Sequence, residues 1–300
     1  MSRIVVTGSS GLIGTALCAS LESDGHDVVR LIRSGKTSEH RVLWNPRAGD
    51  ASGIPAGTLD SVDAIVHLAG AGVGDKRWTD SYKQEILNSR VLSTRTLSAA
   101  LAATAQRPTA FVSGSAIGWY GDTGDRLVDE SAPAGSGFLA DVVVQWEAAA
   151  DAARDAGVRV VHPRTGLVMS KWGGAWQRML PLFKAGLGGK LGSGQQWWSW
   201  ITLRDEVRAL RFLIDTEIQG PVNLVSPAAA TNAEVTAAMA KALKRPAFLP
   251  APAFALKAAL GEFSTEVLGS ARVAPTVLTN AGFSWLDPTL EQALATLLAE

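Results

Sequence analysis

A glycine-rich turn near the N-terminus constrains the fold of this chain more than any other feature. The run Ile4-Val5-Val6 is apolar and β-branched, which predicts a buried strand. This run leads into Gly8, Gly11 and Gly14. Apolar residues then recur at helical spacing, at Leu12, Ile13, Ala16, Leu17 and Leu21. A strand, a glycine turn and a helix in immediate succession are typical of a dinucleotide-binding segment.

The chemistry of dinucleotide binding explains these glycines. A pyrophosphate must approach bare backbone N–H groups at a helix N-terminus, where the helix dipole favours an anion. A side chain at Gly8 or Gly11 would obstruct that approach, and Gly14 lets the helix pack close to the strand. The spacing Gly-x-x-Gly-x-x-Gly differs from the commoner Gly-x-Gly-x-x-Gly, so a purely structural turn is the alternative. The predicted cofactor contacts here are Gly8, Ser9, Ser10, Gly11, Leu12, Ile13 and Gly14.

The end of the second predicted strand indicates which dinucleotide binds. Val28–Ile32 is followed by Arg33, with Lys36 close by. In NAD-binding segments this place, about 20 residues beyond the glycines, usually carries an acid that hydrogen-bonds the ribose 2′-hydroxyl. Positive charge suits the 2′-phosphate of NADP instead, so Arg33 and Lys36 predict NADP(H). The alternative is a solvated arginine at a strand end.

Strands and helices alternate over the first half of the chain. Residues 62–70 predict a buried strand that ends in Leu68, Ala69 and Gly70, where small residues let a cofactor lie across the strand end. Further strands are expected at 111–113 and 158–162, and helices at 79–104 and 138–156. This alternation predicts an α/β fold with a doubly wound parallel sheet of the Rossmann type.

The second half of the chain differs in character. We predict an NADP-binding Rossmann domain over residues 1–165, with 203–225 returning to the sheet. Residues 166–202 and 226–300 would form a smaller substrate lobe, in which 172–200 is rich in glycine and tryptophan and predicts loops. A helical cap is expected from about residue 248.

Composition argues against several classes of function. The 28 basic and 28 acidic residues give a net charge of zero, which offers no case for binding nucleic acid or an anionic membrane. No apolar run is long enough to span a membrane and no signal-peptide pattern is seen, so a cytoplasmic location is expected. Cys18 is the only cysteine, and no residues have metal-ligand spacing. We expect a small-molecule substrate and a monomer or homodimer.

The chain resembles the extended short-chain dehydrogenase/reductases of the nucleotide-sugar epimerase-like group. The matching segments are Thr7–Gly14, His67–Gly70, Ser113–Ala116 with Tyr120-Gly121, and Pro163–Val168. A narrower resemblance is to an atypical epimerase-like subfamily with a C-terminal domain of unknown function. It rests on Asp75–Trp78, Ser89-Arg90, Trp146-Glu147, Gln195–Ile201 and Ala281–Phe283. Members are mostly NAD-dependent epimerase/dehydratase-like proteins of undefined substrate, and some relatives are described as cell-division inhibitors.

The resemblance assigns further residues to the site. To the cofactor it adds Leu68, Ala69, Gly70, Arg90, Ser113 and Pro163. Ser115 fits the family's serine that fixes the substrate oxygen. Arg90 stands where the family has an asparagine, and Leu167 replaces another asparagine.

The acid/base pair of the family is missing. Ordinary members use a tyrosine with a lysine four residues later, and no Tyr-x-x-x-Lys occurs in this chain. Aligning the predicted helix on Glu147 puts Leu139 and Val143 at those two positions. The best substitute acid/base is Tyr120, although simple packing is an equal alternative for it, and Asp141 and His67 are weaker candidates.

Three hypotheses follow. The first is an NADP(H)-dependent oxidoreductase or epimerase that acts on an unidentified carbonyl or sugar-nucleotide substrate. The second is a non-catalytic NADP(H)-binding sensor or regulator, for example of cell division. The third is a scaffold that has lost the cofactor, against which the glycines and Arg33 argue. In the first case the substrate side would carry Arg77, Trp78, Gln196 and Trp200, and packing is the alternative for the tryptophans.

Overall fold

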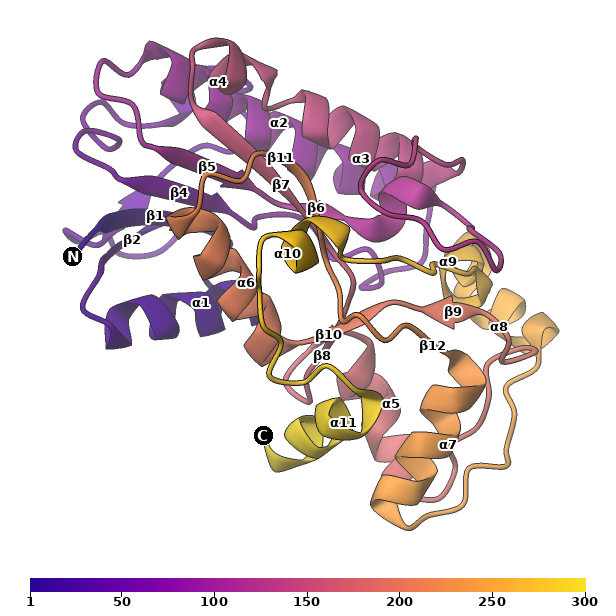
Figure 1. The fold of residues 1–300 in the computed structure, drawn as a ribbon. Coiled ribbons are helices and arrows are strands. Elements are labelled where there is room, and N and C mark those ends of the chain that lie inside the picture. Colours follow the sequence, from indigo (N-terminus) through magenta and orange to yellow (C-terminus); the bar gives the residue numbers. More distant parts are fainter.

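A parallel sheet at the centre of the molecule carries the strand that leads into the glycine turn (Figure 1). The computed structural model describes all of residues 1–300. The strand order is β11-β7-β5-β4-β1-β2-β3, with β6 beside β7, and every pairing is parallel. The strands are β1 Arg3–Thr7, β2 Asp27–Ile32, β3 Arg41–Leu43, β4 Ala64–His67, β5 Ala110–Ser113, β6 Ser115–Ala116, β7 Arg159–Thr165 and β11 Gly220–Leu224. The predicted doubly wound α/β fold is confirmed.

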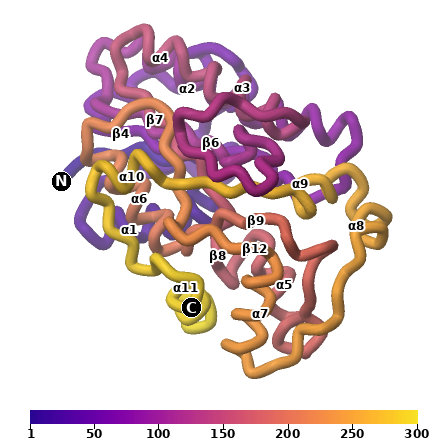
Figure 2. Tube along the Cα trace, turned by 45° about the vertical axis from the view of Figure 1, so that its right-hand side comes forward, coloured from indigo at the N-terminus to yellow at the C-terminus, as the bar shows by residue number.

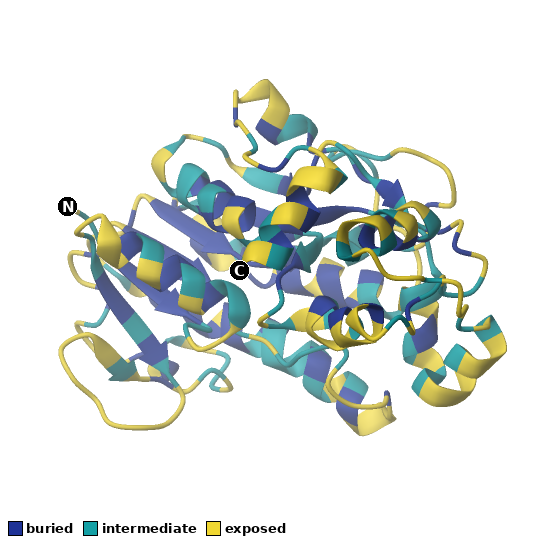
Figure 3. Ribbon diagram, turned by 90° about the horizontal axis from the view of Figure 1, so that it is seen from below, coloured by how far each residue is buried: buried dark blue, intermediate teal, exposed yellow.

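Helices cover both faces of this sheet. Successive strand residues point to opposite faces, so Ile4 and Val6 pack against α1 and α6, whereas Val5 packs with residues of α2 and α4. Figure 3 shows the strands buried and the outer helix surfaces exposed. The helices are α1 Leu12–Ser23, α2 Asp80–Ala103, α3 Phe138–Ala148, α4 Asp151–Asp155 and α6 Leu203–Asp215. Short 3₁₀ turns occur at η1 Ala51–Gly53 and η2 Ile117–Tyr120.

The prediction of one helix over 138–156 is wrong in one respect, because the structure has two helices there, α3 and α4, with a break between them. The N–H of Ala150 bonds the carbonyl of Glu147, three residues back, so the backbone tightens there. The N–H of Ala153 donates to Ser98 Oγ of α2 at 2.8 Å. A side chain of a neighbouring helix therefore takes part in the break.

A second hydrophobic core lies below the sheet in Figure 1. The prediction of loops over 172–200 missed α5, where the helical pattern is weakened by Pro181 inside the helix and by Gly173 and Gly174 at its start. Trp176, Phe183 and Trp200 are buried in this second core. The elements around it are β8 Leu167–Met169, α5 Gly174–Lys184, β9 Trp197–Trp198, β10 Trp200–Thr202, β12 Ala230–Thr231, α7 Asn232–Leu243 and α11 Leu290–Ala299.

The C-terminal segment crosses the molecule from one side to the other. In Figure 2 it runs from α8 and α9 across to α10 and then to α11. Its elements are α8 Ala253–Leu260, η3 Gly261–Phe263, α9 Ser264–Leu268 and α10 Thr276–Asn280. None of the helices combines the length and the hydrophobicity of a membrane-spanning segment.

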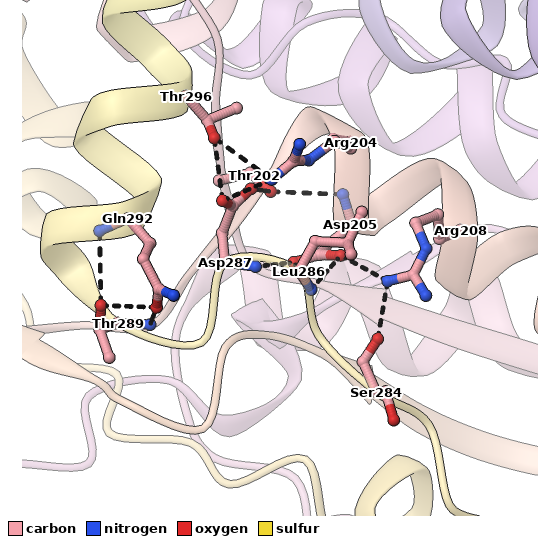
Figure 4. Close-up of polar contacts among 10 residues, drawn as sticks. All are labelled: Thr202, Arg204, Asp205, Arg208, Ser284, Leu286, Asp287, Thr289, Gln292 and Thr296. Carbon is pink, nitrogen blue, oxygen red and sulfur yellow. Dashed lines mark hydrogen bonds and ion pairs between the residues drawn. The ribbon is translucent and has the colours of Figure 1, made fainter.

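Two buried carboxylates fix this segment to the start of α6 (Figure 4). Asp205 accepts the backbone N–H groups of Leu286 and Asp287 at 3.0 and 2.9 Å. Asp287 in turn accepts Thr202 Oγ1 at 2.9 Å and Arg204 Nη2 at 2.7 Å. Because each carboxylate is nearly fully buried and hydrogen-bonded, the junction orders the chain between α10 and α11.

Candidate cofactor and active site

The glycine turn is closed against β4 on one side and open on the other. Gly8 has φ +67°, and a Cβ there would lie 2.6 Å from the Leu68 carbonyl carbon. A Cβ on Gly14 would lie 2.2 Å from the Gly8 carbonyl oxygen, whereas one on Gly11 would meet only that oxygen, at 3.3 Å. Close backbone contacts therefore exclude a side chain at Gly8 and at Gly14. At Gly11 the protein itself leaves room for a small side chain, so the glycine there keeps space free for a bound molecule.

The start of α1 offers unsatisfied donors at this turn. Gly11 is the N-cap and supplies no side-chain cap. The N–H groups of Leu12 and Ile13 have no acceptor in the protein, while Thr15 N–H already bonds Gly11. Free N–H groups at a helix N-terminus beside a bare glycine fit a pyrophosphate.

The carboxyl end of β2 carries free positive charge. Arg33 and Lys36 are exposed and form no ion pair. Arg41, also exposed, approaches the same turn, with its Nη2 3.8 Å from a Cβ placed on Gly35. These cations fit a phosphate, since nothing in the protein neutralises them.

At the end of β4, Gly70 lies beneath the guanidinium of Arg90. A Cβ on Gly70 would lie 3.3 Å from Arg90 Cζ. Arg90 Nη1 donates to the carbonyls of Ala71 and Ile86 at 2.9 and 3.0 Å. The face of Trp146 lies 5.1 Å from Cζ. Burial lowers the pKa of Arg90 to about 10, and no carboxylate pairs with it.

Beyond β5, Ser115 is part of a buried charged network. Ser115 Oγ donates to Glu147 Oε1 at 2.6 Å. Arg164 binds both oxygens of that carboxylate, at 2.8 and 2.9 Å. Burial acts to lower the pKa of Arg164, but the hydrogen bonds and charge of Glu147 outweigh it and raise that pKa. The Ser115 hydroxyl is thus oriented by an ion pair inside the protein.

Tyr120 joins the same network from the opposite side. Its hydroxyl donates to Asn223 Oδ1 at 2.7 Å and accepts from Arg164 Nη1 at 3.1 Å. The residue is 4% exposed, and burial raises the pKa of its phenol. These contacts agree with the packing alternative considered for Tyr120.

The face of α3 that meets the turn after Ser115 is apolar. A Cβ on Gly118 would lie 3.4 Å from Leu139 Cβ and 3.8 Å from Val143 Cγ2. Asp141, one of the weaker acid/base candidates, is exposed on α3. Neither Leu139 nor Val143 can transfer a proton, so the two positions that the resemblance aligns with the family's acid/base pair supply no acid or base.

His67, the other weaker candidate, links three elements of the core. Its Nδ1 lies 2.6 Å from Thr7 Oγ1 and its Nε2 lies 3.0 Å from Ser93 Oγ. Because Ser93 Oγ also donates to the Ser89 carbonyl, the ring is best described with its proton on Nε2. Burial lowers the pKa of His67 to about 3, so the ring is neutral.

The residues predicted for the substrate side are not gathered in one place. Arg77 is exposed and its Nη1 lies 3.3 Å from the Ala258 carbonyl of α8. Trp78 packs between Phe138 and Phe263 and is 7% exposed. Arg77 and Trp78 thus bind the C-terminal segment to the segment after β4.

The other two substrate-side residues lie elsewhere. Gln196 Nε2 donates to the Leu191 carbonyl at 2.9 Å and is buried. Trp200 is 1% exposed in the second core. Of the remaining cofactor residues, Ser113 is buried with an unpaired hydroxyl, and Pro163 is buried within β7.

Comparison with known proteins places the chain in a family. Residues 4–225 match the NAD dependent epimerase/dehydratase family. The chain belongs to this family. Residues 251–297 match a domain of unknown function (DUF1731), which here comprises α8 to α11. The resemblance to an epimerase-like group with such a C-terminal domain is confirmed.

Several members of the epimerase/dehydratase family match over nearly their whole length. Epimerase family protein Mb2239 of Mycobacterium bovis is 45% identical to this chain, and the match covers 97% of this chain and 96% of Mb2239. SDR39U1 of Bos taurus is 37% identical, and the match covers 99% of this chain and 100% of SDR39U1. The crystal structure of human SDR39U1 with NADPH is 33% identical, with a TM-score of 0.90 over 99% of both chains. The structure of MoeE5 in complex with UDP-glucuronic acid and NAD shares the fold. Its sequence is 21% identical, and the TM-score is 0.76 over 99% of this chain and 98% of MoeE5.

The sequence does not indicate which residues hold Ser115 and Tyr120. Glu147 and Arg164 belong to matching segments of the resemblance, and Glu147 also sets the register of the predicted helix. Asn223 lies in the segment predicted to return to the sheet, with no predicted role in the site. The available signal was charge: Glu147 and Arg164 interrupt otherwise apolar segments that the fold buries. Charged residues at such positions are seldom buried unless they are paired.

Proposed function

We propose that the chain binds NADP(H) across the carboxyl ends of β2, β1, β4 and β5 and uses it on a small carbonyl or sugar-nucleotide substrate. The observation that carries this proposal is the open glycine turn flanked by the unpaired cations Arg33 and Lys36. Human SDR39U1, which has been crystallised with NADPH, supports the choice of cofactor.

Each group at the strand ends has a distinct task in this proposal. The N–H groups of Leu12 and Ile13 hold the pyrophosphate, and Arg33 with Lys36 holds the 2′-phosphate. Ala69 and Gly70 leave room for the nicotinamide half. When bound, NADP(H) supplies or accepts a hydride at the nicotinamide ring.

Ser115 orients the substrate oxygen in this proposal. Its only proton is donated to Glu147, so the lone pairs of Oγ remain to accept a hydrogen bond. A substrate hydroxyl is therefore a better match than a carbonyl while the Glu147 contact is made. For a carbonyl substrate the Ser115 hydroxyl must first rotate away from Glu147.

A second candidate function is a non-catalytic NADP(H)-binding sensor or regulator. It is favoured by the internal hydrogen bonds of Ser115 and Tyr120 and by the apolar Leu139 and Val143. In this case the residues at the strand ends bind the cofactor and no proton donor is needed.

Two measurements test the proposal. The first titrates NADPH and NADH while following the fluorescence of the ten tryptophans, and we expect tighter binding of NADPH. The second screens carbonyl compounds for NADPH oxidation and sugar nucleotides for epimerised products. NADPH binding without turnover favours the sensor, and a failure to bind NADPH overturns both candidates.

A further inference from the structure

Positive charge is concentrated in the lobe around the second core. Residues 166–204 and 235–261 contain no Asp and no Glu. The second of these segments carries Lys241, Lys244, Arg245 and Lys257, and all four are exposed. The net charge of zero conceals this separation, because it sums over the whole chain. These segments therefore give the lobe a cationic surface.

Two loops of this lobe pair with each other at the lower right of Figure 1, away from the central sheet. The first loop, 185–192, follows α5, and the second, 244–252, joins α7 to α8. The N–H of Leu249 donates to the carbonyl of Gly188 at 3.2 Å. A Cβ on Gly189 would lie 1.9 Å from the Leu249 carbonyl oxygen, so the two backbones are in close contact. This pairing holds the two loops together as one unit.

Large apolar side chains stand out from these loops and from α8. Phe248 is 74% exposed and Phe254, in the first turn of α8, is 76% exposed. Leu187 and Leu249 are exposed as well. Every residue of α8 except Lys257 is apolar, and yet the helix has no buried residue. A helix that is apolar all round is normally buried, so this exposed apolar surface marks an interaction site.

Cations surround these apolar side chains. Lys184 ends α5 just before the first loop, and Lys244 and Arg245 begin the second. Lys257 follows Phe254 by about one turn of α8. All four cations are exposed, and none of them forms an ion pair. We name the following eight residues the basic apolar tip: Lys184, Leu187, Lys244, Arg245, Phe248, Leu249, Phe254 and Lys257.

We propose that the basic apolar tip docks on an anionic lipid surface. Its cations attract acidic headgroups, and each cation close to such a surface contributes roughly fivefold to the affinity. Its apolar side chains enter the boundary between the headgroups and the acyl chains. Docking of this kind needs no membrane-spanning helix. The inference is independent of the proposed function, since no residue of the tip belongs to the cofactor site.

Charge and shape favour lipid over other partners. A second copy of this chain docked on the same face would bring like cations together, which costs free energy. A groove for a peptide would enclose apolar side chains in a concavity, whereas Phe248 and Phe254 protrude. A nucleic acid would meet the cations but offers no hydrocarbon to Leu187 and Leu249. A lipid surface supplies acidic headgroups beside deformable hydrocarbon and so meets both requirements.

Vesicle flotation of the full chain tests the proposal. The vesicles contain phosphatidylcholine alone, or phosphatidylcholine with about 30% phosphatidylserine. We expect the wild type to bind the phosphatidylserine vesicles, to lose most of this binding at high salt, and not to bind phosphatidylcholine alone. The double variant Phe248→Ala/Phe254→Ala is expected to weaken binding about tenfold or more. Lys244→Gln/Arg245→Gln is expected to weaken it by a similar factor, about tenfold or more.

Matched variants on other faces control for exposure and for charge. Leu43→Ala/Val144→Ala removes two exposed apolar side chains from β3 and α3. Arg95→Gln/Arg107→Gln removes two exposed cations, one from α2 and one from the loop that follows it. Both control variants should bind the phosphatidylserine vesicles as the wild type does. Thermal unfolding shows that each variant is folded, and if one tip variant does not fold, the other decides.

The contrary results are equally clear. No binding of the wild type to phosphatidylserine vesicles, or equal binding to both kinds of vesicle, overturns the proposal. An equal loss in the tip variants and in the controls overturns it too. Sedimentation and binding of a single-stranded DNA oligonucleotide test the other occupants. A dimer or a DNA complex that the tip variants abolish, with no vesicle binding, assigns the tip to that partner instead.

Discussion

Ser115 Oγ and Glu147 Oε1 lie 2.6 Å apart, and Arg164 Nε donates to the same carboxylate oxygen at 2.8 Å. Ser115, the serine predicted to fix the substrate oxygen, is therefore held by a buried ion pair. Such a pair adds little net stability when intact, but breaking it leaves a bare charge in the interior. The network orients Ser115 and makes the fold depend on Glu147.

Replacing Glu147 by glutamine should destabilise the protein strongly. Arg164, 2% exposed, would lose its only carboxylate partner, and we expect a loss of about 3–5 kcal/mol in the free energy of unfolding. Urea unfolding measures this. Glu85→Gln, which breaks the surface pair with Arg47, is the control and should cost less than about 1 kcal/mol. Similar losses in the two variants would contradict a structural role for the network.

Two glycines of the turn should respond differently to alanine. In Gly14→Ala the new Cβ meets the Gly8 carbonyl oxygen at 2.2 Å, so we expect a loss of about 1–3 kcal/mol in stability. In Gly11→Ala the nearest atom is 3.3 Å away, so stability should change by less than about 1 kcal/mol.

Measuring NADPH binding separates the role of these glycines in stability from their role in holding the phosphate. Gly11→Ala places a methyl group where the pyrophosphate approaches and should lose NADPH binding while remaining folded. Thermal unfolding together with fluorescence titration gives both quantities. Normal NADPH affinity in Gly11→Ala would show that the phosphate does not lie on this turn.

Local patterns predicted most of the sheet, because each strand and its following helix carry their own periodicity. The apolar runs Ile4-Val5-Val6 and Ala64-Ile65-Val66 are continuous, which is typical of strands buried on both faces. The break before α4 had no local signal, since it falls in a run of alanines and depends on Ser98 of another helix. Helix α5 was missed because Pro181 and the glycines argue against a helix that tertiary packing nevertheless stabilises.

The candidate site shows the same difference between features set by local sequence and contacts set by the fold. The glycine turn and Arg33 each belong to a contiguous motif, so the sequence alone suffices to predict both as cofactor contacts. The contacts of Ser115 and Tyr120 could not be predicted, because Glu147 is 32 residues from Ser115 and Asn223 is 103 residues from Tyr120. Only the packing of α3 and the return of β11 to the sheet bring these residues together.

Arg33 should set the preference between the two nicotinamide cofactors. Its guanidinium is exposed and unpaired, so its removal costs the fold nothing measurable. Arg33→Ala is expected to weaken NADPH binding about tenfold or more, through the loss of charged hydrogen bonds, and to leave NADH binding unchanged. Fluorescence titration with both cofactors measures this, with Arg95→Ala as the control. An unchanged ratio of affinities would remove Arg33 from the 2′-phosphate site.

Glu206 makes folding depend on pH. It is fully buried in the first turn of α6, and only Oε1 has a partner, Thr165 Oγ1 at 2.8 Å. Its neighbour Asp205 is also buried but accepts several hydrogen bonds. Burial raises the pKa of Glu206 from 4.5 to about 8. Between these two values the folded state holds a proton that the unfolded state releases, so the contribution of Glu206 to stability falls as pH rises.

Glu206→Gln removes this titration while preserving the shape of the side chain. At pH 5 the variant and the wild type should differ by less than about 1 kcal/mol, because Glu206 is protonated in the folded state and pH 5 is only slightly above its pKa of 4.5 in the unfolded state. At pH 8.5 the variant should be more stable by about 1–3 kcal/mol, since the wild type then bears the cost of a buried charge. Urea unfolding at both pH values measures the gap, and Glu39→Gln, on an exposed loop, controls for net charge. A gap that does not widen with pH would mean that Glu206 is ionised in the folded protein and has a partner there.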